Sequence, residues 1–264
     1  NAGTEGAEVS ADTLHVIETG LKLSQKSNGL YDITIAPLVN LWGIGTDHQH
    51  VPTQEEIDNI LPLIDYRKVH VNKGNRVVRL EKPGMKIDLG GIAKGYAADE
   101  AARILKEKGL KRAIINFGGN IYMLGRKASG DKWRIGIQNP GNTPGSYLGI
   151  LTSKETAVVT SGTYERYFIK DGKKYHHIFD PRDGYPIRNN LLSVSIITDK
   201  AIRADGMSTT VFLLGLEEGM EFVENAKGME AIFVTKEHIV HLSSGIQNSF
   251  SITNDEYRLS DKTP

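Results

Sequence analysis

The sequence predicts a mixed α/β protein in which a mixed or antiparallel sheet is flanked by helices. Two patterns lead to this fold class. Apolar residues recur at helical spacing in the first 108 residues and again after residue 204, and short β-type runs dominate between residues 112 and 197. The chain shows no internal repeat and no linker typical of a domain boundary. We therefore expect residues 1–264 to form one compact domain, for which a hydrophobic content of 39% is sufficient.

Helix signals mark five segments. The expected helices are residues 11–26, 53–61, 92–108, 204–214 and 217–226. Ser10 can cap the first of them, and Thr53 with Glu56 forms a capping box at the start of the second. Gly109 ends the third, because helices commonly terminate at a glycine. Apolar spacing alone indicates the last two.

Runs of β-branched and aromatic residues between turn signals indicate the strands. They are expected in a hairpin over residues 69–80 and at residues 86–89, 112–116, 121–124, 133–138, 148–151, 157–160, 167–169, 176–179, 192–197, 231–235, 239–242 and 250–253. Asp171-Gly172 is a typical hairpin turn, so the strands on either side of it should pair.

Two glycines connect the expected strand at 86–89 to the next helix. Gly90 and Gly91 allow a ligand to approach the backbone, N–H groups at a helix start point outward, and Lys94 adds a positive charge. This combination favours a phosphate site, although its spacing matches neither a P-loop nor a dinucleotide-binding motif. A tight turn with a solvated lysine is the alternative.

A carboxyl and a hydroxyl group lie near the start of the helix expected at 204–214. Asp205 and Thr209 are four residues apart and therefore share a helix face. Hard oxygen ligands of this kind suit Mg²⁺ beside substrate phosphates. Alternatively, Asp205 caps the helix and Thr209 bonds back to the backbone.

Two adjacent histidines lie in the expected strand at 176–179. Strand alternation places His176 and His177 on opposite faces, so only one should point inward, where it can act as a general base for a hydroxyl nucleophile. A hydrogen-bonded core histidine is the alternative. The spacing of the histidines does not match a zinc site.

Two further segments carry aromatic, hydroxyl and amide side chains. Residues 31–43 combine aromatic side chains with Asp32, Thr34 and Asn40, and residues 160–167 offer hydroxyls, a glycine and Arg166. Such segments can bind an aromatic ring that is hydrogen bonded at its edge. Tyr31 and Trp42 can equally belong to the core.

Composition excludes several functional classes. The 32 basic and 32 acidic residues cancel, which gives no general electrostatic case for nucleic acid or an anionic membrane. The absence of cysteine excludes disulfides, thiolate metal sites and a cysteine nucleophile. From the residues alone, the ligand is phosphorylated and aromatic, with a Mg²⁺ ion as a candidate companion.

Together these segments resemble the ApbE-type FAD:protein FMN transferases over residues 1–253. The matching motifs are Tyr31-Asp32-Ile33-Thr34 with Pro37-Leu38-Val39-Asn40-Leu41-Trp42-Gly43, Lys86-Ile87-Asp88-Leu89-Gly90-Gly91-Ile92-Ala93-Lys94-Gly95-Tyr96, Gly118-Gly119-Asn120, Thr160-Ser161-Gly162 with Tyr164, His177-Ile178-Phe179-Asp180-Pro181 with Gly184-Tyr185-Pro186, and Ala204-Asp205 with Ser208-Thr209. Several motifs in the order of one family are very unlikely to arise by chance.

The resemblance implies Mg²⁺-dependent transfer of the FMN moiety of FAD to a threonine or serine hydroxyl of an acceptor protein, with release of AMP. It implies metal ligation by Asp205, Thr209 and the backbone carbonyl of Ala93, and catalytic roles for His177, Asp205 and Lys94. The implied FAD-binding residues are Tyr31, Asp32, Thr34, Asp88, Gly90, Gly91, Lys94, Gly119, Asn120, Thr160, Ser161, Gly162, His177 and Asp180. Two alternatives are a Mg²⁺-dependent FAD pyrophosphatase that uses water at the same site, and a non-catalytic FAD-binding protein.

Members of this family normally carry one more strand and helix before the point that matches Asn1, and we expect this chain to lack them. The resemblance also implies an extracytoplasmic location, in the periplasm or at the cell surface. Membrane contact is then expected only through an N-terminal lipid anchor that this chain does not contain.

Overall fold

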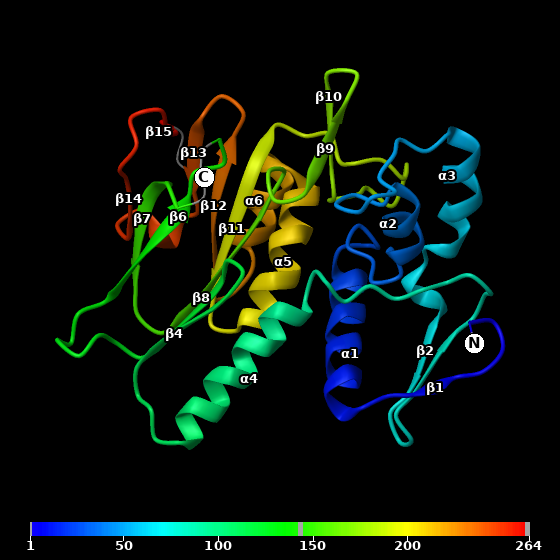
Figure 1. Ribbon diagram of the computed structural model, residues 1–264. Helices are drawn as coiled ribbons and strands as arrows, with labels where there is room; N and C mark the ends of the chain where they lie inside the picture. Colours follow the sequence, from blue (N-terminus) through cyan, green and yellow to red (C-terminus); the bar gives the residue numbers. More distant parts are fainter. Residues whose placement is uncertain (1, 142–144, 262–264) are drawn as a thin grey trace. The chain divides into compact units, whose positions relative to one another are not determined.

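Contacts in the computed structural model divide the chain into two compact units (Figure 1). The first unit comprises Asn1–Gly91 and Glu165–Arg188, and the second comprises Ile92–Tyr164 and Asn189–Pro264. The structure describes residues 2–141 and 145–261. The expectation of one compact domain over 1–264 stays a prediction, and the units are described one at a time.

The first unit contains three α-helices and two small sheets among its described residues. Its helices are α1 (Ala11–Lys26), α2 (Ala36–Trp42) and α3 (Gln54–Ile60), with short 3-10 helices at Leu61–Leu63 and Tyr66–Lys68. One sheet has the order β1 (Ala7–Glu8), β3 (Val77–Leu80), β2 (Val69–Asn72); the other is the hairpin of β9 (Tyr167–Lys170) and β10 (Lys173–His176). All pairs in both sheets are antiparallel.

An aromatic cluster forms part of the core of the first unit. Trp42 is fully buried and its Nε1 donates to the carbonyl of Gly184 at 2.9 Å. Its ring lies 5.5 Å from that of Tyr175 and 5.7 Å from that of Phe179, centroid to centroid. Of the two interpretations of Trp42, the structure therefore supports a core residue.

The second unit is built on a seven-stranded mixed sheet. Its order is β15 (Arg258–Leu259), β13 (Ile239–Leu242), β12 (Met229–Thr235), β11 (Leu191–Thr198), β8 (Thr156–Gly162), β5 (Asn120–Leu124), β4 (Ala113–Phe117). Only the pair β13–β15 is parallel among these described strands. A three-stranded antiparallel sheet has the order β14 (Phe250–Ile252), β7 (Tyr147–Ser153), β6 (Trp133–Gln138).

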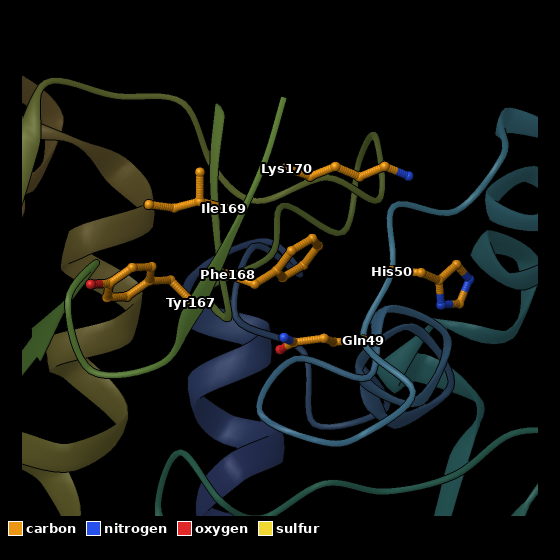
Figure 2. Close-up of a pocket in the computed structure, with 6 residues that line it drawn as sticks. All are labelled: Gln49, His50, Tyr167, Phe168, Ile169 and Lys170. Atoms are coloured by element: carbon orange, nitrogen blue, oxygen red, sulfur yellow. The ribbon is translucent and has the colours of Figure 1, made fainter. Parts of the chain in front are cut away.

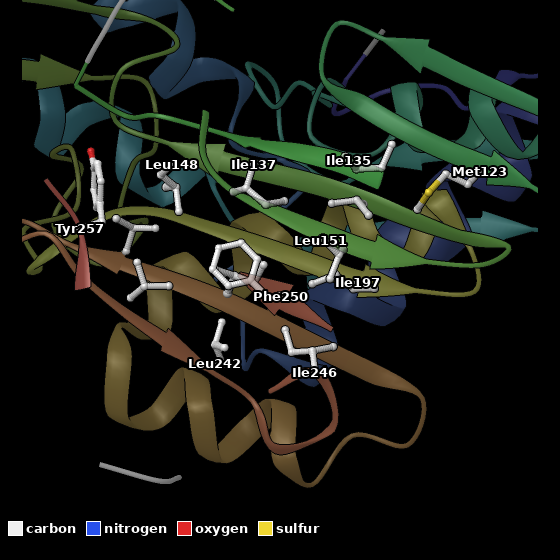
Figure 3. Packing of buried hydrophobic residues seen from close by; sticks show 14 residues of the cluster. Met123, Ile135, Ile137, Leu148, Leu151, Ile197, Leu242, Ile246, Phe250 and Tyr257 are labelled. Carbon is white, nitrogen blue, oxygen red and sulfur yellow. The ribbon is translucent and has the colours of Figure 1, made fainter. Parts of the chain in front are cut away.

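Alternate strand residues place apolar side chains on both faces of the large sheet. On one face, residues such as Met123 and Ile197 pack against Ile135, Leu151 and Phe250 of the small sheet (Figure 3). The other face carries the helices α4 (Ala93–Glu107), α5 (Ala201–Leu214) and α6 (Leu216–Glu224), with α5 packed on β8 and β11 (Figure 1). The predicted fold class, mixed α/β with flanking helices, is confirmed.

Most expected elements are present, and two expected strands are wrong. Residues 86–89 are extended but form no strand, because the only backbone bond shown for them within this unit is from the Asp88 N–H to the Ile33 carbonyl, at 2.8 Å. β10 ends at His176, and beyond it Phe179 forms only an isolated bridge with Pro186. α2 was not expected, although a proline in the first turn is a known start signal.

None of the helices in the described part of the chain is both long enough and apolar enough to cross a membrane.

Candidate active site

The carboxyl group of Asp205 lies where α4 and α5 of the second unit approach each other. α5 begins at Ala201, so Asp205 lies in its second turn and the interpretation as a helix cap is wrong. Its Oδ2 accepts a hydrogen bond from the backbone N–H of Gly95, 2.8 Å away. The structure thus brings together the glycine-lysine motif and the aspartate motif, which lie 110 residues apart in the sequence.

Asp99 belongs to no motif, yet it fixes the same helix pair. Its two carboxylate oxygens accept hydrogen bonds from the backbone N–H groups of Ala201, at 2.9 Å, and Ile202, at 3.0 Å. These donors lie in the first turn of α5 and have no partner within that helix. Burial raises the pKa of Asp99, and the two hydrogen bonds oppose that rise. The sequence alone did not identify Asp99. Asp99 lies four residues after Gly95 and so shares its helix face, but this spacing is informative only once α5 is known to pack on that face.

Gly95 permits the close approach of the two helices. A Cβ atom at this position would overlap the carbonyl oxygen of Ala201 and would lie 2.7 Å from the Cβ of Asp205. The backbone at Ala201 cannot relieve this overlap by rotating away, as a side chain could. The absence of a side chain at residue 95 is therefore a steric requirement of the site.

We expect Gly95→Ala to destabilise the protein by about 1–3 kcal/mol, the usual cost of overpacking, even though alanine favours helix more than glycine. The Mg²⁺-dependent activity proposed below should fall with it, because α4 must move away from Asp205. Denaturant unfolding and activity assays measure the two effects. Gly219→Ala in α6 is the control, since its new Cβ would lie no closer than 3.0 Å to any atom. Equal stability of the two variants would contradict the prediction.

Burial controls the electrostatics of Asp205. The residue is 5% exposed, and this burial raises the pKa of its carboxyl group, against the opposing effects of Asn120, the Gly95 N–H and the charge of Lys94. Asn120 is also buried, and its Nδ2 makes no full hydrogen bond to any described residue. A buried carboxylate with a raised pKa is a site that a cation would stabilise.

Hydroxyl groups from β8 and α5 contact one another, and one of them, on Thr209, shares a helix face with Asp205. The Oγ of Ser161 lies 2.8 Å from the Oγ of Ser208 and 3.2 Å from the Oγ1 of Thr209. Ser208 in turn donates to the backbone carbonyl of Asp205 at 2.8 Å. Ser161 therefore joins the predicted metal ligands Asp205 and Thr209, whereas Thr160 points to Ser195, with 2.7 Å between the hydroxyls.

The oxygen groups fit Mg²⁺ better than a softer metal. Within residues 2–141 and 145–261, no three histidine, cysteine, aspartate or glutamate side chains gather as a metal site. One carboxylate with hydroxyl and carbonyl oxygens is typical of Mg²⁺ sites that phosphate groups complete. Ala93, the first residue of α4, is exposed, and ligation by its carbonyl stays a prediction.

Two more predicted residues of the second unit lie at the surface. Lys94 is exposed in the first turn of α4, where the helix dipole also attracts anions. Gly119 is exposed in the turn between β4 and β5, with a φ of 94° that favours glycine, and its N–H donates to Asn116 Oδ1 at 2.9 Å. Gly162, by contrast, is buried at the end of β8.

In the first unit, Asp32 and Thr34 serve the fold. The Asp32 carboxylate accepts from the N–H and hydroxyl of Thr34, at 2.8 and 2.7 Å, and from the N–H of Tyr66 at 2.9 Å. The Thr34 hydroxyl also accepts from the Asp65 N–H at 2.8 Å. Both side chains are buried, so they hold the loop before α2; a direct contact with FAD stays a prediction for them.

Tyr31, Asp88, Gly90 and Gly91 lie together in the same unit. Asp88 Oδ1 accepts from the Gly90 N–H at 2.6 Å, and a Cβ on Gly91 would lie 3.4 Å from the Tyr31 ring. Neither glycine has a positive φ. Their absence of side chains leaves the backbone open to a ligand, as the phosphate interpretation requires.

The two histidines after β9 differ in their surroundings. His176 is 7% exposed, its Nε2 lies 3.2 Å from the Ile187 carbonyl, and its Nδ1 accepts from the Ile178 N–H at 3.3 Å. His177 is half-buried, with Nδ1 3.2 Å from the Arg166 carbonyl. His176 is thus the core histidine, and His177 is the one that can reach a ligand.

Asp180 closes the turn that follows the histidines. Its carboxylate forms an ion pair with Arg182, 2.6 Å from Nη2, and accepts from the Arg182 N–H at 2.9 Å. The side chain is buried, so its evident role is to fix the turn after Phe179. A role in binding FAD stays a prediction.

Comparisons with known proteins agree with this chemistry. The profile of the ApbE family matches residues 1–233. The chain is 38% identical over 262 residues to an FAD:protein FMN transferase of Klebsiella pneumoniae, covering 99% of this chain and 81% of that protein. It is 33% identical to an FAD:protein FMN transferase of Treponema pallidum, over 98% of this chain and 75% of the relative.

Solved structures show the same similarity. The crystal structure of the ApbE protein of Thermotoga maritima superposes with a TM-score of 0.86 at 33% identity, covering 93% of this chain and 80% of that one. The flavin transferase ApbE of Vibrio cholerae gives a TM-score of 0.82 at 29% identity, over 94% of this chain and 80% of the other.

Proposed function

Because this chain belongs to the ApbE family and is an FAD:protein FMN transferase, we propose that it transfers FMN with the help of Mg²⁺ to a threonine or serine hydroxyl and releases AMP. The observation that supports the metal requirement is Asp205, a buried carboxyl group that accepts the Gly95 N–H and shares a helix face with Thr209, whose hydroxyl contacts Ser161. Asp205, Thr209 and the Ala93 carbonyl would hold the ion. When bound, Mg²⁺ supplies positive charge that stabilises the phosphoryl oxygens during transfer.

The reaction exchanges one phosphorus–oxygen bond for another. The acceptor hydroxyl oxygen forms a bond to the FMN phosphorus, the bridging bond of the pyrophosphate breaks, and AMP leaves with that oxygen. We assign the role of general base for the hydroxyl proton to His177, and Lys94 stabilises negative charge on the phosphates. The Gly90-Gly91 backbone, which packs on the buried Tyr31 ring, offers one surface against which FAD can be oriented.

The decisive experiment follows two products at once. The protein is incubated with FAD and Mg²⁺, with a threonine-bearing acceptor or its Thr→Ala version, while AMP release and acceptor mass are measured. We expect AMP release, and a mass gain equal to FMN on the threonine-bearing acceptor but not on its Thr→Ala version. Neither product should form when EDTA replaces Mg²⁺. AMP with free FMN and no labelled acceptor would indicate the pyrophosphatase, and intact FAD would indicate a binding protein.

We further propose that the protein acts outside the cytoplasm, in the periplasm or at the cell surface. This proposal depends on the family resemblance alone. Fractionation of the producing cells tests it, and enzyme found only in the cytoplasmic fraction would contradict it.

A further inference from the structure

The β9–β10 hairpin of the first unit has an unpaired edge next to His177. Because β9 and β10 form a two-stranded sheet, neither strand has a second neighbour among the described strands. The hairpin turns tightly at Asp171-Gly172, where φ is 51° and 72°. A strand edge of this kind can accept a further strand from another chain.

The register shows which groups the outer edge of β9 offers. The His177 N–H donates to the Arg166 carbonyl at 3.1 Å, which makes these residues a hydrogen-bonded pair. Such pairs alternate along an antiparallel ladder, so Phe168 with Tyr175 and Lys170 with Lys173 are the next ones. The N–H and C=O groups of Tyr167 and Ile169 therefore point away from β10. The same two side chains are 44% and 65% exposed.

A groove lies against β9. A cavity of about 570 Å³ is lined by all four residues of β9 on one side and by Gln49 and His50 on the other (Figure 2). Phe168 and Lys170 point toward Gln49 and His50, while Tyr167 and Ile169 point the opposite way (Figure 2). A strand of four residues spans about 13 Å, so a short extended peptide can follow β9 along its full length.

The charge of the hairpin selects the kind of peptide. Its two strands carry Lys170, Lys173 and Lys174 and no acidic residue, and its turn adds Asp171, so the hairpin as a whole has more positive than negative side chains. None of these lysines pairs with a carboxylate of the described residues; the Lys174 ammonium instead lies 4.0 Å from the centre of the Tyr167 ring. Acidic side chains would complement the lysines, and aliphatic ones would cover Tyr167 and Ile169.

The base of the hairpin adjoins the proposed general base. Both the N–H and the Nδ1 of His177 contact the carbonyl of Arg166, the residue directly before β9. A strand added at β9 would therefore pass Arg166, the residue that His177 contacts, as it leaves the Tyr167 end.

We propose that the β9 edge binds an extended segment of the acceptor protein, rich in acidic and aliphatic residues, as a third strand that leads the acceptor hydroxyl to His177. This inference rests on the proposed function and names the partner of the same site. A lipid surface fits the groove less well, because the outward N–H and C=O groups of Tyr167 and Ile169 would lose their hydrogen bonds in hydrocarbon.

The test uses the full chain and a fluorescent ten-residue peptide of alternating aspartate and valine that ends in threonine. Binding is followed by anisotropy without FAD or Mg²⁺, so the result does not depend on whether FMN transfer to a hydroxyl is correct. We expect saturable binding that weakens with salt, and a loss of about tenfold or more in the Lys170→Glu/Lys173→Glu variant, whose two lysines are cross-strand partners on one face. Lys26→Glu, a charge change at the end of α1, should bind as the wild type does.

Backbone pairing is tested with two N-methylated versions of the peptide, each methylated at alternate residues. Only one set of N–H groups can face β9, so one version should lose binding and the other should retain it. Equal binding by both versions, no saturable binding of the parent peptide, or unchanged affinity in the correctly folded double variant would overturn the proposal. So would binding to phosphatidylglycerol vesicles in its place.

Discussion

Asp205→Asn is expected to lower Mg²⁺-dependent FMN transfer by about 10³-fold or more while leaving the protein folded. Loss of a metal that neutralises phosphoryl charge removes several kcal/mol of transition-state stabilisation, which corresponds to a factor of this size. Asparagine keeps an oxygen that can accept the Gly95 N–H, so the contact between α4 and α5 remains. AMP release at saturating FAD measures the effect.

Stability distinguishes loss of the metal from loss of the fold. Burial raises the pKa of Asp205, so the folded protein holds this proton more tightly than the unfolded chain does. The contribution of Asp205 to stability is therefore greatest below the usual aspartate pKa and is lost as pH rises through the raised value. At neutral pH the metal-free Asp205→Asn variant should be at least as stable as the wild type.

Mg²⁺ should make the wild type more stable than the Asp205→Asn variant, which reverses the order of stability expected without the metal. At a concentration 100 times the Kd, a bound ion stabilises a folded protein by about 2.7 kcal/mol. We expect a rise in Tm with Mg²⁺ for the wild type and none for Asp205→Asn. Equal Mg²⁺-dependent shifts in both proteins would remove Asp205 from the metal site.

Local signals in the sequence predicted most of the fold. α1 has the expected bounds because its cap, Ser10, and its apolar face are encoded within the helix itself. The strand expected at 86–89 fails for the opposite reason: its apolar residues have no neighbouring strand to pair with, and only tertiary structure decides that. α2 was missed because aromatic and polar residues in its sequence suggested a ligand site, whereas Trp42 is a core residue.

The sequence predicted several of the residues at the site, but it did not predict the structural role of each of them. Asp205 and Thr209 were recognised by their spacing, and Ser161 indeed lies beside Thr209. The role of Asp99 could not be predicted from the sequence, because its hydrogen-bond donors are backbone N–H groups of a helix that lies more than 100 residues later in the chain. Asp32 and Asp180 resemble ligand-binding carboxylates in the sequence, yet the structure occupies both with internal hydrogen bonds.

His177→Ala is expected to slow FMN transfer by about 10²- to 10⁴-fold, the usual contribution of a general base, with little change in FAD affinity or Tm. The side chain is half-buried, with Nδ1 3.2 Å from the Arg166 carbonyl, and the His177 backbone N–H keeps the hairpin register when the side chain is removed. Single-turnover transfer at saturating FAD separates the chemical step from binding.

His176→Ala is the matched control, since it removes the same side chain one residue earlier. His176 is buried and bonded to the Ile187 carbonyl and the Ile178 N–H, so its loss leaves a cavity and an unsatisfied donor and should cost about 2–4 kcal/mol of stability. Below its lowered Tm, this variant should retain transfer far better than His177→Ala. If His176→Ala stops transfer while still folded and His177→Ala does not, the roles of the two histidines are reversed and the general base is the buried one.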